Sequence, residues 1–100
     1  MPLNRNTLIR IRTIDTCLHR RQRLWTLEDL RQACEDALYD YEGISSISTR
    51  TIQRDIELMR GDKLGYYAPI VVKDKKYYTY EDPNFSITQL PLTKQDLAEL

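Results

Sequence analysis

Apolar side chains at helical spacing run through the first sixty residues and constrain the fold more than any other feature. They occur in three segments, at residues 7–21, 27–41 and 49–60. In the first segment the apolar positions are Leu8, Ile11, Ile14 and Leu18. A spacing of three and four residues places such side chains on one face of a helix. The sequence therefore predicts three amphipathic helices, the first from Asn6 or Thr7 to about Arg21.

Polar and turn-forming residues mark the ends of these helices. A short break at residues 24–26 precedes the second helix, and Thr26 is its expected N-cap. Gly43 follows that helix, and Ser48 is the expected N-cap of the third. Trp25 is expected to be a core or staple residue ahead of the cap. Arginines 10, 12, 20 and 21 lie off the apolar stripe of the first helix, so they are expected to be solvated or to contact a partner.

A β-hairpin is predicted after the third helix. Residues 70–72 and 77–80 have the composition of strands and flank Asp74-Lys75. The order of helix, break, helix, loop, helix and hairpin is that of a winged helix-turn-helix. The fold class is therefore mainly α with a small β-hairpin (α+β), with three helices, a two-stranded wing and a domain over residues 1–80.

The charges of the chain are sorted into blocks, although 15 basic and 15 acidic residues cancel overall. Residues 1–25 carry six arginines against one aspartate, and residues 26–47 carry one arginine against six acidic residues. Residues 48–80 are again net basic, and residues 81–100 are net acidic. The basic blocks coincide with elements that a winged helix would point at phosphate, which favours a nucleic-acid partner.

The third helix begins with side chains suited to DNA. The candidate DNA-binding residues here are Ser48, Thr49, Arg50, Thr51, Gln53 and Arg54. Arginine can pair with guanine, glutamine with adenine, and hydroxyls with phosphate. At the hairpin, Lys73, Lys75 and Lys76 are expected to contact flanking phosphates. The alternative at this point is a solvated amphipathic helix in which Arg50 or Arg54 pairs with Asp55 or Glu57.

The segment Ser-x-Arg-Thr-Ile-x-Arg-Asp-Ile at 48–56, with Gly65-Tyr66 and Tyr77-Tyr78, resembles the N-terminal winged helix of WYL-domain transcriptional regulators. Residues 85–97 are similar to the link that leaves the wing in such proteins. The resemblance implies binding to double-stranded operator DNA as a homodimer of the full-length protein. It also implies an effector that binds outside these residues, in a downstream domain. The DNA contacts that it implies are Ser48, Arg50, Thr51 and Arg54.

Residues 81–100 are predicted to be a connector. A capping-box-like start at Thr93 and Asp96 begins a helix that would lead into a further, WYL-like effector domain. We expect the connector to dock on that domain, and these 100 residues alone to be monomeric or weakly dimeric.

Other classes of function have less support. Cys17 and Cys34 lack CxxC spacing, and with the single His19 they cannot form a four-ligand zinc site, so two packed free thiols and no metal or cofactor are expected. No enzyme is predicted, because no nucleophile or paired carboxylates accompany that histidine. Without a signal peptide or membrane span, a cytoplasmic location is expected. The runner-up is a protein-binding winged helix that uses the acidic helix 27–41 and the tyrosine-rich hairpin, although packing in the core is the simpler role for those tyrosines.

Overall fold

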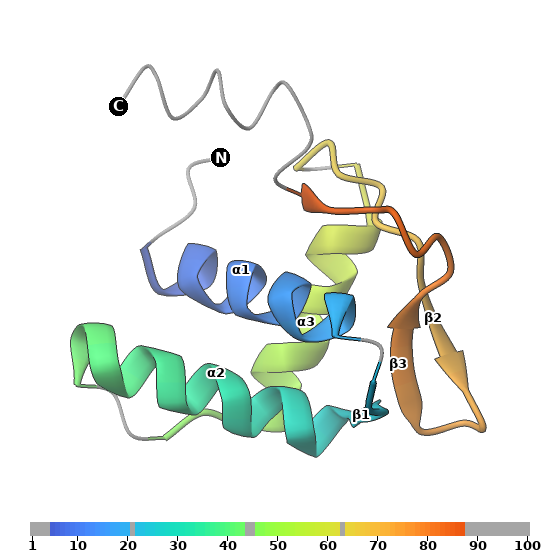
Figure 1. Cartoon of the computed structure of the whole chain (residues 1–100). Helices are drawn as coiled ribbons and strands as arrows, with labels where there is room; N and C mark the ends of the chain where they lie inside the picture. Colours follow the sequence, from blue (N-terminus) through green and yellow to red (C-terminus); the bar gives the residue numbers. More distant parts are fainter. Residues whose placement is uncertain (1–4, 21, 44–45, 63, 88–100) are drawn as a thin grey trace.

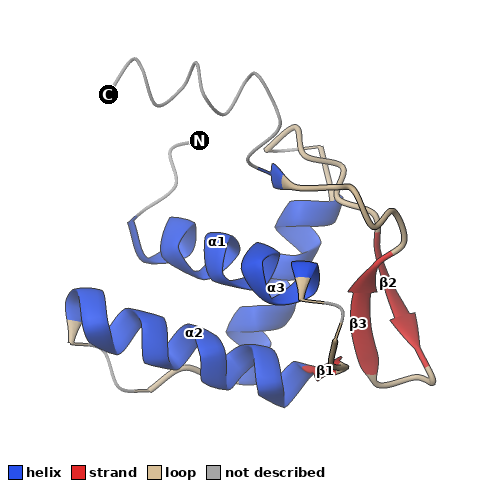
Figure 2. Cartoon of the chain, viewed as in Figure 1, coloured by secondary structure: helices blue, strands red, loops and turns tan. Residues whose placement is uncertain are grey.

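The computed structural model of the chain describes residues 5–20, 22–43, 46–62 and 64–87. Within these ranges the elements are α1 (Arg5–His19), β1 (Trp25–Thr26), α2 (Leu27–Glu42), α3 (Thr49–Arg60), β2 (Ile70–Lys73) and β3 (Tyr77–Tyr80). In Figure 1, α1 lies over α2, α3 crosses behind both, and the sheet closes one end. Figure 2 shows how much of the described chain is helical. The predicted class, mainly α with a small wing, is confirmed.

Local capping explains where α2 and α3 begin. The Thr26 hydroxyl accepts a hydrogen bond from Asp29 N at 3.1 Å, and the Asp29 carboxylate accepts one from Thr26 N at 3.0 Å. This reciprocal pair is a capping box, and it satisfies two backbone donors that the first turn leaves open. Ser48 caps α3 by accepting from Thr51 N at 3.3 Å. Both predicted N-caps are confirmed, and Gly43 ends α2 in the left-handed region at φ 70°.

The sheet has a strand that the sequence did not reveal. A two-stranded wing was predicted, but the described sheet has three strands in the order β1-β3-β2. Trp25 and Thr26 pair with Tyr78 and Tyr77, so residues predicted as a break form the edge strand. A two-residue strand is too short to show alternation, and it forms only because the distant hairpin supplies its backbone partners.

The core lies where the three helices meet the inner face of the sheet. Its members come from every element and include Ile11, Ile14, Leu30, Ile52, Ile56, Met59, Ile70 and Tyr80. Trp25 is buried in this core, as predicted, and its indole N–H donates to Arg20 O at 3.2 Å. Tyr66 and Tyr80 are buried as well, whereas Tyr67 is 66% exposed. The tyrosines on or beside the hairpin therefore divide between buried and exposed positions.

A buried carboxylate joins α1 to the wing and to the chain that follows it. Asp15 Oδ1 accepts from the Tyr80 hydroxyl at 2.6 Å and from Ile87 N at 3.3 Å, and Oδ2 accepts from the Ser86 hydroxyl at 3.2 Å. Phe85 packs edge-to-face on the Tyr80 ring, with 4.9 Å between centroids. The first residues of the predicted connector thus pack on the winged helix, and the predicted helix from Thr93 lies outside the described residues.

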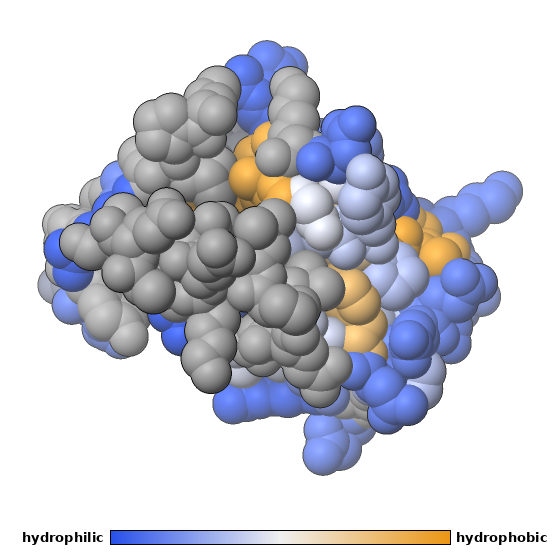
Figure 3. All heavy atoms as spheres, turned by 90° about the horizontal axis from the view of Figure 1, so that it is seen from above, coloured by the Kyte–Doolittle hydropathy of each residue, from blue (hydrophilic) through white to orange (hydrophobic). Residues whose placement is uncertain are grey.

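The described surface in Figure 3 is mostly hydrophilic, with a few small hydrophobic patches. None of the described helices is long and apolar enough to cross a membrane.

Candidate nucleic-acid interface

Helix α3 has one buried side and one exposed side. Ile52, Ile56 and Met59 fix the buried side in the core. Arg50, Gln53 and Arg54 are exposed on the other side, Thr51 is half-buried beside them, and Thr49 is exposed in the first turn. Because the apolar residues hold the rotation of the helix, the long polar side chains of its first two turns must face solvent.

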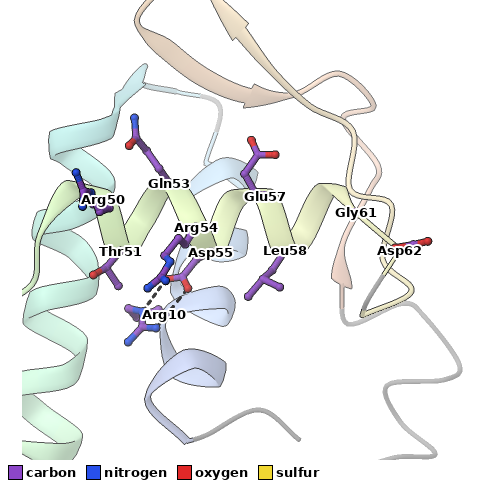
Figure 4. A pocket seen from close by; sticks show the side chains of 10 residues that line it. All are labelled: Arg10, Arg50, Thr51, Gln53, Arg54, Asp55, Glu57, Leu58, Gly61 and Asp62. Atoms are coloured by element: carbon purple, nitrogen blue, oxygen red, sulfur yellow. Dashed lines mark hydrogen bonds and ion pairs between the residues drawn. The ribbon is translucent and has the colours of Figure 1, made fainter. Parts of the chain in front are cut away.

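An open groove of about 700 Å³ runs along this exposed side. Figure 4 shows two rows of side chains on α3: Gln53 and Glu57 project to one side, and Thr51 and Arg54 project to the other, where Arg10 of α1 lies. Hydrogen-bond donors and acceptors on long and short side chains therefore line one continuous surface. Such a surface suits hydrogen bonding to base edges.

A buried ion pair sets the position of α3 against α1. Arg10 Nε donates to Asp55 Oδ2 at 2.6 Å, and Arg10 Nη2 reaches Asp55 Oδ1 at 3.3 Å and Thr7 Oγ1 at 3.1 Å. The Asp55 side chain is 3% exposed and that of Arg10 is 14% exposed. Burial raises the pKa of Asp55 above its ordinary value, and the Arg10 guanidinium opposes that rise.

This pair corrects two expectations. Arg10 was expected to be solvated or to contact a partner, but it is bound to Asp55, because the crossing of α1 over α3 brings together residues 45 positions apart. The alternative pairing of Asp55 with Arg50 or Arg54 is not what the structure shows, since Asp55 lies on the buried side of α3 and takes Arg10 as its partner.

The last turn of α3 is tied to the wing. Arg60 donates to Ile70 O through Nε at 3.0 Å and through Nη2 at 2.9 Å. Its Nη1 pairs with Glu57 Oε1 at 3.2 Å. These hydrogen bonds fix the end of α3 relative to the base of the hairpin.

The wing places its basic residues away from that groove. Lys73, Lys75 and Lys76 are exposed at the end of the hairpin. Asp74 and Lys75 form the turn at φ 52° and 63°, so the hairpin turns without glycine. Lysines in this position can contact a phosphate backbone beside the groove that α3 would occupy.

Two residues that line the groove and one beside the wing were not predicted as functional residues. No sequence pattern indicated the role of Arg10, because its partner Asp55 lies on another helix. Glu57 could have been found, since it follows Gln53 by four residues on the same exposed face. Arg23 stacks on the Trp25 ring at 4.1 Å and pairs with Asp29 at 3.0 Å, an arrangement created when β1 joins the sheet.

The surface of α2, which the alternative protein-binding function would use, is less uniformly acidic than the sequence implied. On α2, Arg31 pairs with both Glu28 and Glu35, so part of the acidic charge is neutralised within the helix. Among the described side chains of this helix, Tyr39 is the exposed large hydrophobic one, at 63%.

Helices α2 and α3, joined by a loop and followed by a hairpin that packs beside them, define a winged helix-turn-helix domain. The family model for the N-terminal winged helix domain of WYL domain-containing proteins matches residues 6–81, and the chain belongs to that family. Neither a curated protein nor a solved structure matches the chain.

Proposed function

We propose that this domain binds double-stranded DNA sequence-specifically as part of a bacterial-type transcriptional regulator, with α3 in the major groove. The observation that carries the proposal is that Arg50, Gln53 and Arg54 are all exposed on a helix whose opposite side is packed in the core. Membership of a winged helix family supports it. A helix presented in this way can enter the major groove by its N-terminal half.

The chemistry of each side chain determines which part of the DNA it would contact. Arg50 and Arg54 can each donate two hydrogen bonds to guanine, and Gln53 can pair with adenine. Thr49 and Thr51 carry hydroxyls that suit phosphate, as does Ser48 beside its capping role. The Arg10–Asp55 pair would keep this row at a constant angle to the rest of the domain.

The wing would supply affinity without sequence preference. Lys73, Lys75 and Lys76 would lie on flanking phosphates and displace bound cations, which makes binding depend on salt. In the full-length protein we expect a homodimer on two half-sites, with any effector bound outside residues 1–100. A cytoplasmic location follows from this proposal, because operator DNA of a bacterial-type regulator lies there.

The test begins with selection of bound sites from random duplex DNA by the full-length protein. The selected duplex is then titrated with the Arg50→Ala and Arg54→Ala variants by fluorescence anisotropy. Each variant is expected to lose about 1–3 kcal/mol of binding free energy. Arg12→Ala is the matched control, because Arg12 is exposed on α1 and does not line the α3 groove. If both α3 variants bind like wild type, α3 is not the helix that contacts the bases.

A protein-binding role is the second candidate, and the exposed Tyr39 on α2 is the observation that favours it. The dependence of binding on salt concentration distinguishes the DNA-binding role from the protein-binding role. DNA binding through phosphates must weaken steeply with ionic strength, whereas an apolar protein contact need not.

A further inference from the structure

The exposed side of α3 carries a carboxylate among its basic and amide groups. Glu57 is 71% exposed and projects to the same side of the helix as Gln53, on the groove surface (Figure 4). Asp62 lines the far end of the same groove. The groove therefore changes from basic at Arg50 and Arg54 to acidic beyond them, which is unexpected for a surface that binds DNA only through phosphate.

Glu57 is held in place by a group that is itself anchored. The Arg60 guanidinium is fixed by its two hydrogen bonds to Ile70 O on β2, and it reaches Glu57 from that position. An exposed ion pair of this kind adds little to stability. What it does is restrict the carboxylate, so that less side-chain entropy is lost when Glu57 contacts a ligand.

The chemistry of a carboxylate limits what it can contact in DNA. An ionised glutamate only accepts hydrogen bonds, so phosphate oxygens and the acceptor atoms of guanine and thymine repel it. The matching donors in the major groove are exocyclic amino groups, and the pairing of Glu with the N4 amino group of cytosine is the established one.

We propose that Glu57 is a specificity-determining residue: it accepts a hydrogen bond from the amino group of a cytosine in the target and disfavours guanine or thymine at that position by repulsion. This inference rests on the proposed DNA binding by α3. Four residues separate Gln53 from Glu57, about 6 Å along the helix axis. Bases on one strand are spaced by about 3.4 Å. Glu57 therefore contacts a base about two pairs from the one that Gln53 contacts.

Glu57→Gln tests this inference, because it removes the charge and keeps the size of the side chain. Binding of the full-length protein is measured on its selected duplex and on a scrambled duplex at one salt concentration. The variant is expected to bind the scrambled duplex more tightly. Its preference for the selected duplex is expected to fall by about 5- to 150-fold, the range for loss of one good side-chain–base pair.

Glu81→Gln is the matched control, since it removes the same charge from an exposed glutamate just after β3. It is expected to leave the preference unchanged. A repeated site selection with Glu57→Gln should lose or change the preference at one C·G pair, and thermal unfolding of both variants checks that the fold is intact.

The outcomes keep the two proposals apart. If the wild-type protein selects no duplex at all, the proposed function fails. If the wild type selects a site but Glu57→Gln selects the same site with the same preference over scrambled DNA, the role of Glu57 is overturned and DNA binding by α3 stands.

Discussion

Replacing Arg10 by methionine isolates the contribution of the ion pair between α1 and α3. The change keeps the apolar stem of the side chain and removes the guanidinium that both carboxylate oxygens of Asp55 contact, at 2.6 and 3.3 Å. Asp55 is then left as a 3% exposed carboxylate without its cation. The charge of Arg12, two residues along α1, is exposed, so Arg12→Met is the matched control.

The size of the effect follows from the burial of the two partners. Removing one partner of a buried pair costs about 3–5 kcal/mol, because the remaining charge stays buried without compensation. We expect a loss of about 3 kcal/mol at pH 7, at the lower end, since Arg10 is 14% exposed and water can reach the vacated position. Domains of this size have free energies of unfolding of about 5–15 kcal/mol, so the loss is readily measured.

The loss should also depend on pH in a defined direction. Burial already raises the pKa of Asp55 above its ordinary value of 3.8, and removal of Arg10 raises it further. A carboxyl whose folded-state pKa lies above its unfolded value binds its proton more tightly when folded, so the folded state gains as the pH falls. The cost of Arg10→Met is therefore expected to shrink between pH 7 and pH 5.

Urea unfolding at pH 7 and pH 5, followed by circular dichroism, measures both effects. Arg12→Met is expected to stay within about 0.5 kcal/mol of wild type, as surface substitutions usually do. The double variant Arg10→Met/Asp55→Leu should recover most of the loss, because an apolar pair can replace a buried ion pair. A loss at Arg10→Met no larger than that at Arg12→Met, or one that is the same at both pH values, would refute the assigned role of the pair.

Four further predictions concern the framework around the site. Tyr80→Phe removes the 2.6 Å hydrogen bond to Asp15 and should cost about 1.5–3 kcal/mol in urea unfolding, as for hydrogen bonds to charged groups; a loss under 0.5 kcal/mol would show that Asp15 does not need this donor. Thr26→Ala removes the capping hydroxyl and should lower the free energy of unfolding by about 1 kcal/mol in the same urea measurement. Hydrogen bonds from the Thr26 backbone and hydroxyl, with Arg23 nearby, hold the pKa of Asp29 below its ordinary value of 3.8. Asp29→Ala should therefore lower the free energy of unfolding at pH 7, and this loss should disappear as the pH falls below 3.8. Burial raises the pKa of Cys17 to about 11 and that of Cys34 to about 12, so both thiols should react with Ellman's reagent at pH 8 only after urea is added; rapid reaction of the folded chain would contradict their burial.

The sequence by itself determined the features that depend on near neighbours along the chain. Helical periodicity located α2 and α3 and placed Arg50, Gln53 and Arg54 opposite Ile52 and Ile56. The first helix was also found, although it ends at His19 rather than near Arg21. Caps and periodic faces are predictable because their partners lie within one turn of the same helix.

Only the tertiary structure decided which distant groups meet. Residues 25 and 26 become a strand because β3, more than fifty residues later, supplies their hydrogen-bond partners. Arg10 becomes part of the framework under α3 because the helix crossing brings it to Asp55, and no spacing along the chain encodes that meeting. A charge pattern shows how many arginines face away from an apolar stripe, whereas the packing of one helix on another decides which of them remain available to a ligand.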